Sequence, residues 1–91
     1  MKILNIGDTF LNVNNIIRFN VTDVEDNAVC IETETFNRRI HSYIEDCTAK
    51  EVIEVLTKWL NDPNKTVIKV DLEVRILQQE LSERRDTFEL L

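Results

Sequence analysis

A chain of 91 residues, of which 43% are hydrophobic and 31% charged, is long enough for one domain and too short for a large core. The net charge is −6 and residues 1–45 and 46–91 contribute −3 each, so we expect no basic face for nucleic acid or anionic membrane. Two cysteines and one histidine are too few for the roughly four ligands of a structural zinc site, and no apolar run is long enough to span a membrane.

The N-terminal residues and the cysteines indicate an intracellular protein. Met1-Lys2 leads directly into a mixed segment that lacks the apolar stretch of a secretory signal. We therefore expect a cytoplasmic protein whose Cys30 and Cys47 are reduced thiols. A small core often gains stability from a disulfide, a metal or a second subunit. Because the first two are disfavoured, we expect a homo-oligomer, and we predict no cofactor.

Residues 1–46 are predicted to be β-rich. Lys2–Ile6 and Thr9–Val13 are separated by a turn at Gly7, the single glycine. Three later segments alternate apolar with polar residues, which is typical of strands buried on one face. These segments are Ile17–Thr22, Val29–Glu34 and Arg39–Ile44, with Ile17, Phe19 and Val21 on the inner face of the first. The expected arrangement is an antiparallel meander of four to five short strands.

Residues 47–61 are predicted to form a helix. Thr48 and Glu51 have the spacing of a capping box, in which each side chain accepts a hydrogen bond from the backbone of the other. Pro63 restricts the residue before it, so the helix should end near Asn61. An apolar stripe follows the cap at helical spacing, formed by Val52, Ile53, Leu56, Trp59 and Leu60.

Residues 66–90 carry two patterns at once and are expected to be mainly helical. Apolar residues alternate over 68–76 as in a strand, whereas from Val70 onward they step by four and three as in a coiled-coil seam. The sequence leaves residues 66–76 open between strand and helix. We favour a short extended stretch followed by a helix from about Asp71 to Phe88, because the later residues are good helix formers.

The C-terminal helix is a candidate dimerisation helix. Leu72 and Ile76 fall on the side opposite Leu77 and Leu81, and a helix that is apolar on two sides requires burial on two sides. One side can pack on its own sheet, and the other on a second subunit. The predicted oligomer interface consists of Val74, Leu77, Leu81, Arg84 and Phe88. The whole chain, residues 1–91, is thus expected to be a single α+β domain in which the β-meander precedes two helices.

Candidate sites for chemistry are few. A single glycine excludes the Gly-rich phosphate loops. Cys47 and His41 are the most plausible nucleophile–base pair, with Cys30 as the second choice of nucleophile, and no third residue orients them, so we expect no enzyme.

The densest set of hydrogen-bond donors is a candidate site for an anionic ligand. It consists of Arg38, Arg39, His41 and Tyr43. The last three share one face of a strand, and the arginine fork suits phosphate or carboxylate. The alternative that we favour is that Glu32 and Glu34 on the preceding strand pair with Arg39 and His41.

The order of a short meander and a capped helix over residues 10–61 resembles that of the flagellar FlbD-type proteins and, more distantly, of the LytTR DNA-binding domains. No specific motif accompanies this resemblance, and the acidic charge opposes a LytTR-like role. We expect a non-enzymatic, self-associating protein, such as a small phage or bacterial accessory or inhibitor protein, that acts by binding a partner protein. The alternatives are a protein that sequesters an anionic small molecule such as a nucleotide, and an acidic nucleic-acid mimic.

Overall fold

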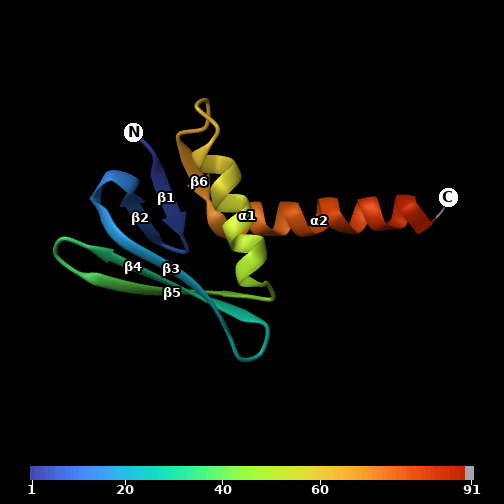
Figure 1. The fold of residues 1–91 in the computed structure, drawn as a ribbon, viewed down its shortest axis with the longest axis horizontal. Coiled ribbons are helices and arrows are strands. Elements are labelled where there is room, and N and C mark those ends of the chain that lie inside the picture. Colours follow the sequence, from blue (N-terminus) through green and yellow to red (C-terminus); the bar gives the residue numbers. More distant parts are fainter. Residues whose placement is uncertain (90–91) are drawn as a thin grey trace.

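The chain folds as the α+β protein predicted from the sequence, with five strands before the first helix (Figure 1). The computed structural model describes the backbone of residues 1–89 and the side chains of residues 1–84. The elements are β1 (Ile3–Ile6), β2 (Thr9–Asn12), the 3-10 turn η1 (Val13–Asn15), β3 (Ile16–Val24), β4 (Ala28–Thr35), β5 (Arg39–Glu45), α1 (Ala49–Leu60), β6 (Val67–Lys69) and α2 (Val70–Glu89). Neither helix, within this part of the chain, is both long and apolar enough to cross a membrane.

The strands form two three-stranded sheets. The first has the order β2-β1-β6 and the second the order β3-β4-β5. The predicted antiparallel meander is present in the second sheet, where β4 pairs with both neighbours. In the first sheet β6 lies parallel to β1, with Ile68 opposite Leu4. The chain reaches this position by crossing over through α1, as parallel strands require.

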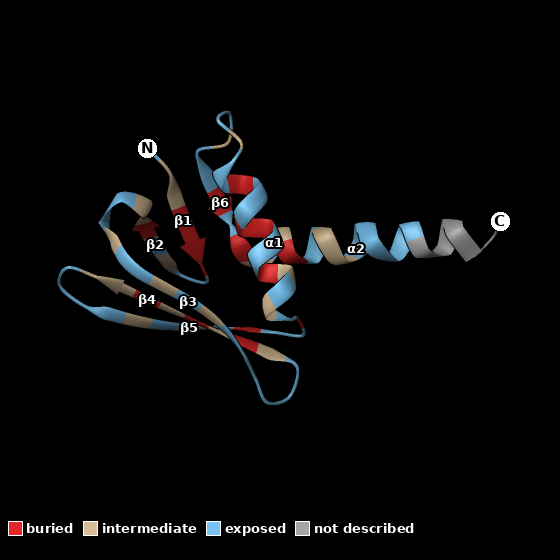
Figure 2. Ribbon diagram, in the orientation of Figure 1, coloured by how far each residue is buried: buried red, intermediate tan, exposed pale blue. Residues whose placement is uncertain are grey.

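One apolar cluster joins both sheets and both helices (Figure 2). Its central side chains have almost no exposed surface, because α1 packs between β3 and α2. Burial of such side chains supplies most of the stability of a small domain. The buried apolar residues are Leu4, Ile6, Leu11, Val29, Ile31, Ile44, Cys47, Val52, Val55, Leu56, Trp59, Ile68, Val70 and Val74.

Both ends of α1 are capped by side chains. At the N-terminus the predicted capping box is present: Glu51 N donates to Thr48 Oγ1 at 3.3 Å, and Thr48 N donates to Glu51 Oε1 at 2.9 Å. Asp23 on β3 adds a second cap, since its Oδ1 accepts from Ala49 N at 2.7 Å. These contacts satisfy backbone donors that have no partner within the helix.

At the C-terminus of α1 the cap comes from the other end of the chain. Lys2 Nζ donates to the carbonyl oxygens of Trp59, Asp62 and Lys65 at 3.0, 2.7 and 2.7 Å. The same ammonium lies 4.9 Å from the centre of the Trp59 ring. A cation at this position complements the carbonyls and the negative end of the helix dipole.

The helix α2 has one half in the core and one half outside it. Residues 66–76, left open by the sequence, are a short strand followed by a helix that begins at Val70. Arg75 and Gln78 attach the first half to the β5–α1 turn, where Arg75 Nη1 and Gln78 Nε2 each donate to Asp46 O at 2.8 Å. Residues 79–84 are all exposed, so the second half projects from the body and lengthens the molecule to 53 Å (Figure 1).

Candidate interaction surfaces

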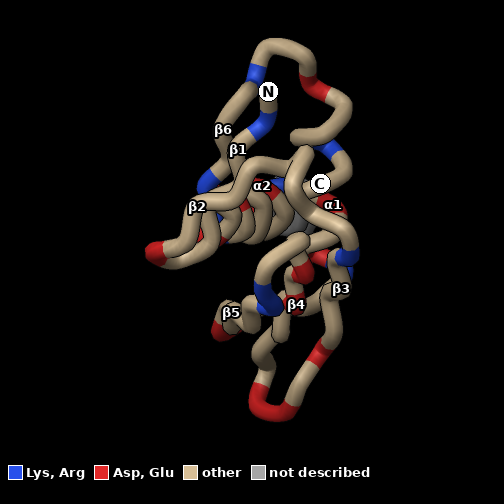
Figure 3. The backbone as a smooth tube through the Cα atoms, turned by 90° about the vertical axis from the view of Figure 1, so that its left-hand side faces the viewer, with Lys and Arg blue, Asp and Glu red and all other residues tan. Residues whose placement is uncertain are grey.

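Charges of both signs are distributed along the chain (Figure 3). Acidic residues gather at the β3–β4 turn, where Glu25 and Asp26 are exposed. No group of three or more His, Cys, Asp or Glu in the described residues is placed to hold a metal ion.

The outer face of the β3-β4-β5 sheet carries the candidate anion-binding residues together with carboxylates. Arg39 lies opposite Glu34, and His41 lies opposite Glu32. Arg39 Nε is 3.4 Å from Glu32 Oε1, and Arg39 Nη2 is 3.7 Å from Glu34 Oε2. His41 Nε2 is 3.7 Å from Glu32 Oε2. The two donors therefore take part in the cross-strand ion pairs that the sequence analysis favoured.

The remaining two members of the predicted site have different surroundings. Tyr43 shares the outer face of β5 and lies opposite Cys30, and a hydrogen bond with the Cys30 side chain raises the pKa of Tyr43. Arg38 precedes β5 in the β4–β5 turn, where its carbonyl accepts from Thr35 N at 2.8 Å. The structure thus brings together Arg39, His41 and Tyr43, and it places Arg38 outside the strand.

Cys47 and His41 do not form a nucleophile–base pair. Cys47 is 4% exposed and belongs to the core, where its thiol donates to Ile44 O at 3.6 Å. Burial raises the pKa of this thiol, which disfavours the reactive thiolate. His41 is exposed on the outer face of β5, whereas Ile44 of the same strand points into the core.

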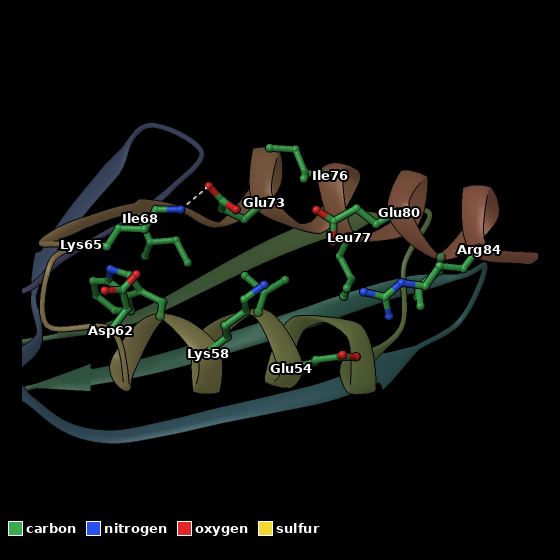
Figure 4. A pocket seen from close by; sticks show the side chains of 13 residues that line it. Glu54, Lys58, Asp62, Lys65, Ile68, Glu73, Ile76, Leu77, Glu80 and Arg84 are labelled. Atoms are coloured by element: carbon green, nitrogen blue, oxygen red, sulfur yellow. Dashed lines mark hydrogen bonds and ion pairs between the residues drawn. The ribbon is translucent and has the colours of Figure 1, made fainter.

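A groove of about 170 Å³ lies between α1 and α2 (Figure 4). Its buried side chains are Val55 and Trp59 of α1 and Ile68 of β6, and Leu77 of α2 points toward α1. Charged and exposed apolar side chains form the walls. They are Glu54, Lys58, Asp62, Lys65, Glu73, Ile76, Glu80, Leu81 and Arg84.

The walls of the groove combine charge with exposed apolar surface. Lys65 Nζ pairs with Glu73 Oε1 at 2.7 Å at one end. At the other end, the Arg84 side chain is directed back along α2 toward Leu77 (Figure 4). Leu81 is 39% exposed beside it, so an apolar strip continues past the end of the core. Such a strip between charged rows resembles the surfaces that bind amphipathic helices.

The predicted oligomer interface requires one correction. Val74 is fully buried inside its own chain, because the first turns of α2 pack on β1 and α1, so it is not available to a second subunit. Leu77 is partly buried against the core, and Leu81 and Arg84 are exposed. All three line the groove. The side chain of Phe88 lies outside the described residues.

A second hollow of about 570 Å³ lies at the opposite end of the molecule from α2, and the sequence analysis missed it. It exposes Phe10, Ile17 and Phe36 to 66%, 65% and 88% and also includes the Arg38 side chain. The prediction that Ile17 lies on the buried face of its strand is wrong. The pairing of β3 with β4 shifts between Ile16 and Arg18, and such a bulge turns the following side chain to the other face.

Comparison with family models, with curated proteins and with solved structures found no match to this chain. The interpretation of its surfaces therefore rests on its own sequence and geometry.

Proposed function

We propose that this protein is a non-enzymatic interaction protein that self-associates through the α1–α2 groove. The observation that carries the proposal is that α2 continues past the core with its apolar strip uncovered. Helices in proteins gain most of their stability from packing an apolar face against another element. The residues of this second half whose side chains the structure describes, 79–84, are all exposed, so a second protein chain is the simplest cover.

The size and lining of the groove favour a helix over a small molecule. Pockets for small ligands usually enclose roughly 300–1,000 Å³, whereas this groove encloses about 170 Å³. A space of this size accepts side chains projecting from a helix laid across it. The charged walls supply the polar rim that accompanies an apolar centre in protein interfaces.

The substitution Leu81→Asp tests self-association. Leu81 is exposed, so the change should leave the fold intact while placing a carboxylate in the apolar strip. We expect wild-type protein to be a dimer by light scattering coupled to gel filtration, and the variant to be a folded monomer whose strand signal in circular dichroism is unchanged. Phe36→Asp at the opposite end makes the same kind of change and should leave the dimer intact. A wild-type protein that stays monomeric at high concentration would rule out the proposal.

Nucleotide sequestration by Arg39, His41 and Tyr43 is the less favoured function. Glu32 and Glu34 already pair with Arg39, Glu32 also lies 3.7 Å from His41, and both carboxylates would repel a phosphate. A thermal-shift panel of nucleotides checks this alternative, because a ligand at 100 times its Kd stabilises a protein by about 2.7 kcal/mol. Mimicry of nucleic acid would need a continuous acidic face, whereas basic residues are interspersed with the acids (Figure 3).

A further inference from the structure

We propose that the groove is covered by α2 of a second copy of this chain, packed antiparallel to the first. This inference rests on the proposed self-association and specifies its geometry. The helix contributes six side chains to the groove, at intervals of three, one, three, one and three positions, so they form one stripe. These are Glu73, Ile76, Leu77, Glu80, Leu81 and Arg84.

When two copies of the stripe run in opposite directions, the charge at each end of one copy is opposite to the charge that it faces on the other. An antiparallel pair centred between residues 78 and 79 places Glu73 opposite the partner's Arg84, Ile76 opposite the partner's Leu81 and Leu77 opposite the partner's Glu80. A twofold axis repeats each contact, so the interface has an ion pair at each end and Ile76–Leu81 contacts inside them, while the exposed Glu80 of each copy lies nearest the axis. Ile76 and Leu81 are each 39% exposed in the single chain, so the pairing covers both uncovered apolar groups of the stripe.

A parallel arrangement in register lacks this complementarity. It places Glu73, Glu80 and Arg84 each opposite the same residue of the second copy. Three rows of like charges would then face one another, which is unfavourable at an interface. A chain of net charge −6 already repels its copy, so the arrangement that pairs opposite charges is strongly preferred.

The lengths of the elements also fit an antiparallel pair. The stripe from Glu73 to Arg84 is roughly 16 Å long at the usual rise of an α-helix. Its first part lies beside α1, and its last part projects beyond the core (Figure 1). In an antiparallel pair the projecting half of each copy therefore lies over the groove of the other.

Charge-swapped variants test the register. Arg84→Glu leaves two acids at the paired positions, and Glu73→Arg leaves two bases, so each variant alone repels its own copy. Mixing them restores opposite charges at both ends. We expect each variant alone to dimerise about tenfold more weakly than wild type, and native mass spectrometry of an equimolar mixture to show predominantly the mixed dimer.

The controls separate the two levels of the proposal. Gln79 is exposed and does not line the groove, so Gln79→Glu and Gln79→Arg should dimerise as wild type and mix statistically. Wild-type protein without dimers refutes self-association itself. A parallel pair in register already faces like charges in wild type, so charge variants that dimerise alone as tightly as wild type refute the antiparallel register and leave self-association standing.

Hydrogen exchange gives an independent measurement if Glu73→Arg, which also breaks the ion pair with Lys65, fails to fold. In wild-type protein, amide protection of residues 76–84 should rise with protein concentration. Protection that rises instead around Phe10 and Phe36 would overturn the proposed interface.

Discussion

Replacement of Lys2 by methionine should destabilise the fold far more than its place near the end of the chain suggests. The Lys2 ammonium donates to three carbonyls at the C-terminus of α1 and lies against the Trp59 ring. Methionine keeps a side chain of similar length and removes the donor and the charge. The carbonyls of Trp59, Asp62 and Lys65 then depend on water for hydrogen bonds.

The expected loss follows from these contacts. A hydrogen bond to a charged group contributes about 1.5–3 kcal/mol, and a cation over an aromatic ring adds about 0.5–1 kcal/mol at partly exposed sites. Because Lys2 is part-exposed, water replaces much of what is lost. We therefore expect a decrease of about 2–3 kcal/mol in the free energy of unfolding, or roughly 10–20 °C in Tm for a domain of this size.

Urea unfolding followed by circular dichroism measures this change. Lys69→Met is the matched control, since Lys69 is exposed on β6, and it should lie within about 0.5 kcal/mol of wild type. A Lys2→Met variant as stable as the control would show that the cap contributes nothing, and the reasoning about the end of α1 would fail.

Two further predictions concern the attachment of α2 and the buried thiol. Arg75→Ala removes the donors to the β5–α1 turn and should cost about 1–2 kcal/mol in urea unfolding while accelerating amide exchange in α2. Because burial raises the pKa of Cys47 above its ordinary value of 9.0, the neutral thiol contributes stability that is complete below that value and is lost as pH rises above it. Cys47→Ala should flatten the decline in stability measured between about pH 8 and about pH 10; an equally steep decline would contradict this cause.

Local patterns predicted the elements whose stability is local. The capping box of Thr48 and Glu51, the end of α1 near Asn61, and the meander of β3, β4 and β5 all depend on residues close in sequence. The pairing of β1 with β6 was not predictable in this way, because Leu4 and Ile68 lie far apart in the sequence. The role of Lys2 as a cap of α1 was not predictable for the same reason, because its hydrogen-bond partners lie 57 to 63 positions away in the sequence.

The candidate surfaces were predictable in part. Alternation placed Arg39, His41 and Tyr43 on one face, and the carboxylates that pair with the first two were named beforehand. Alternation failed at Ile17, which lies at the bulge between Ile16 and Arg18 and turns outward, whereas Phe19 and Val21 keep to the inner face; no sequence pattern marks the bulge. The spacing of apolar residues along α2 did not predict which of them the chain itself buries. Val74 is buried within its own chain, whereas Leu81 is exposed.

That division of α2 makes its second half dependent on association. Isolated helices shorter than about 12–15 residues are marginally stable in water, and within the second half of α2, residues 79–89, the side chains that the structure describes (79–84) are all exposed. Dissociation of the proposed dimer should therefore fray this segment, which contains about a third of the residues in α1 and α2. Dilution through the dimer Kd should lower the helical circular dichroism signal by a similar fraction, whereas the strand signal should stay constant. A helical signal independent of concentration across dissociation would show that residues 79–89 hold their helix alone.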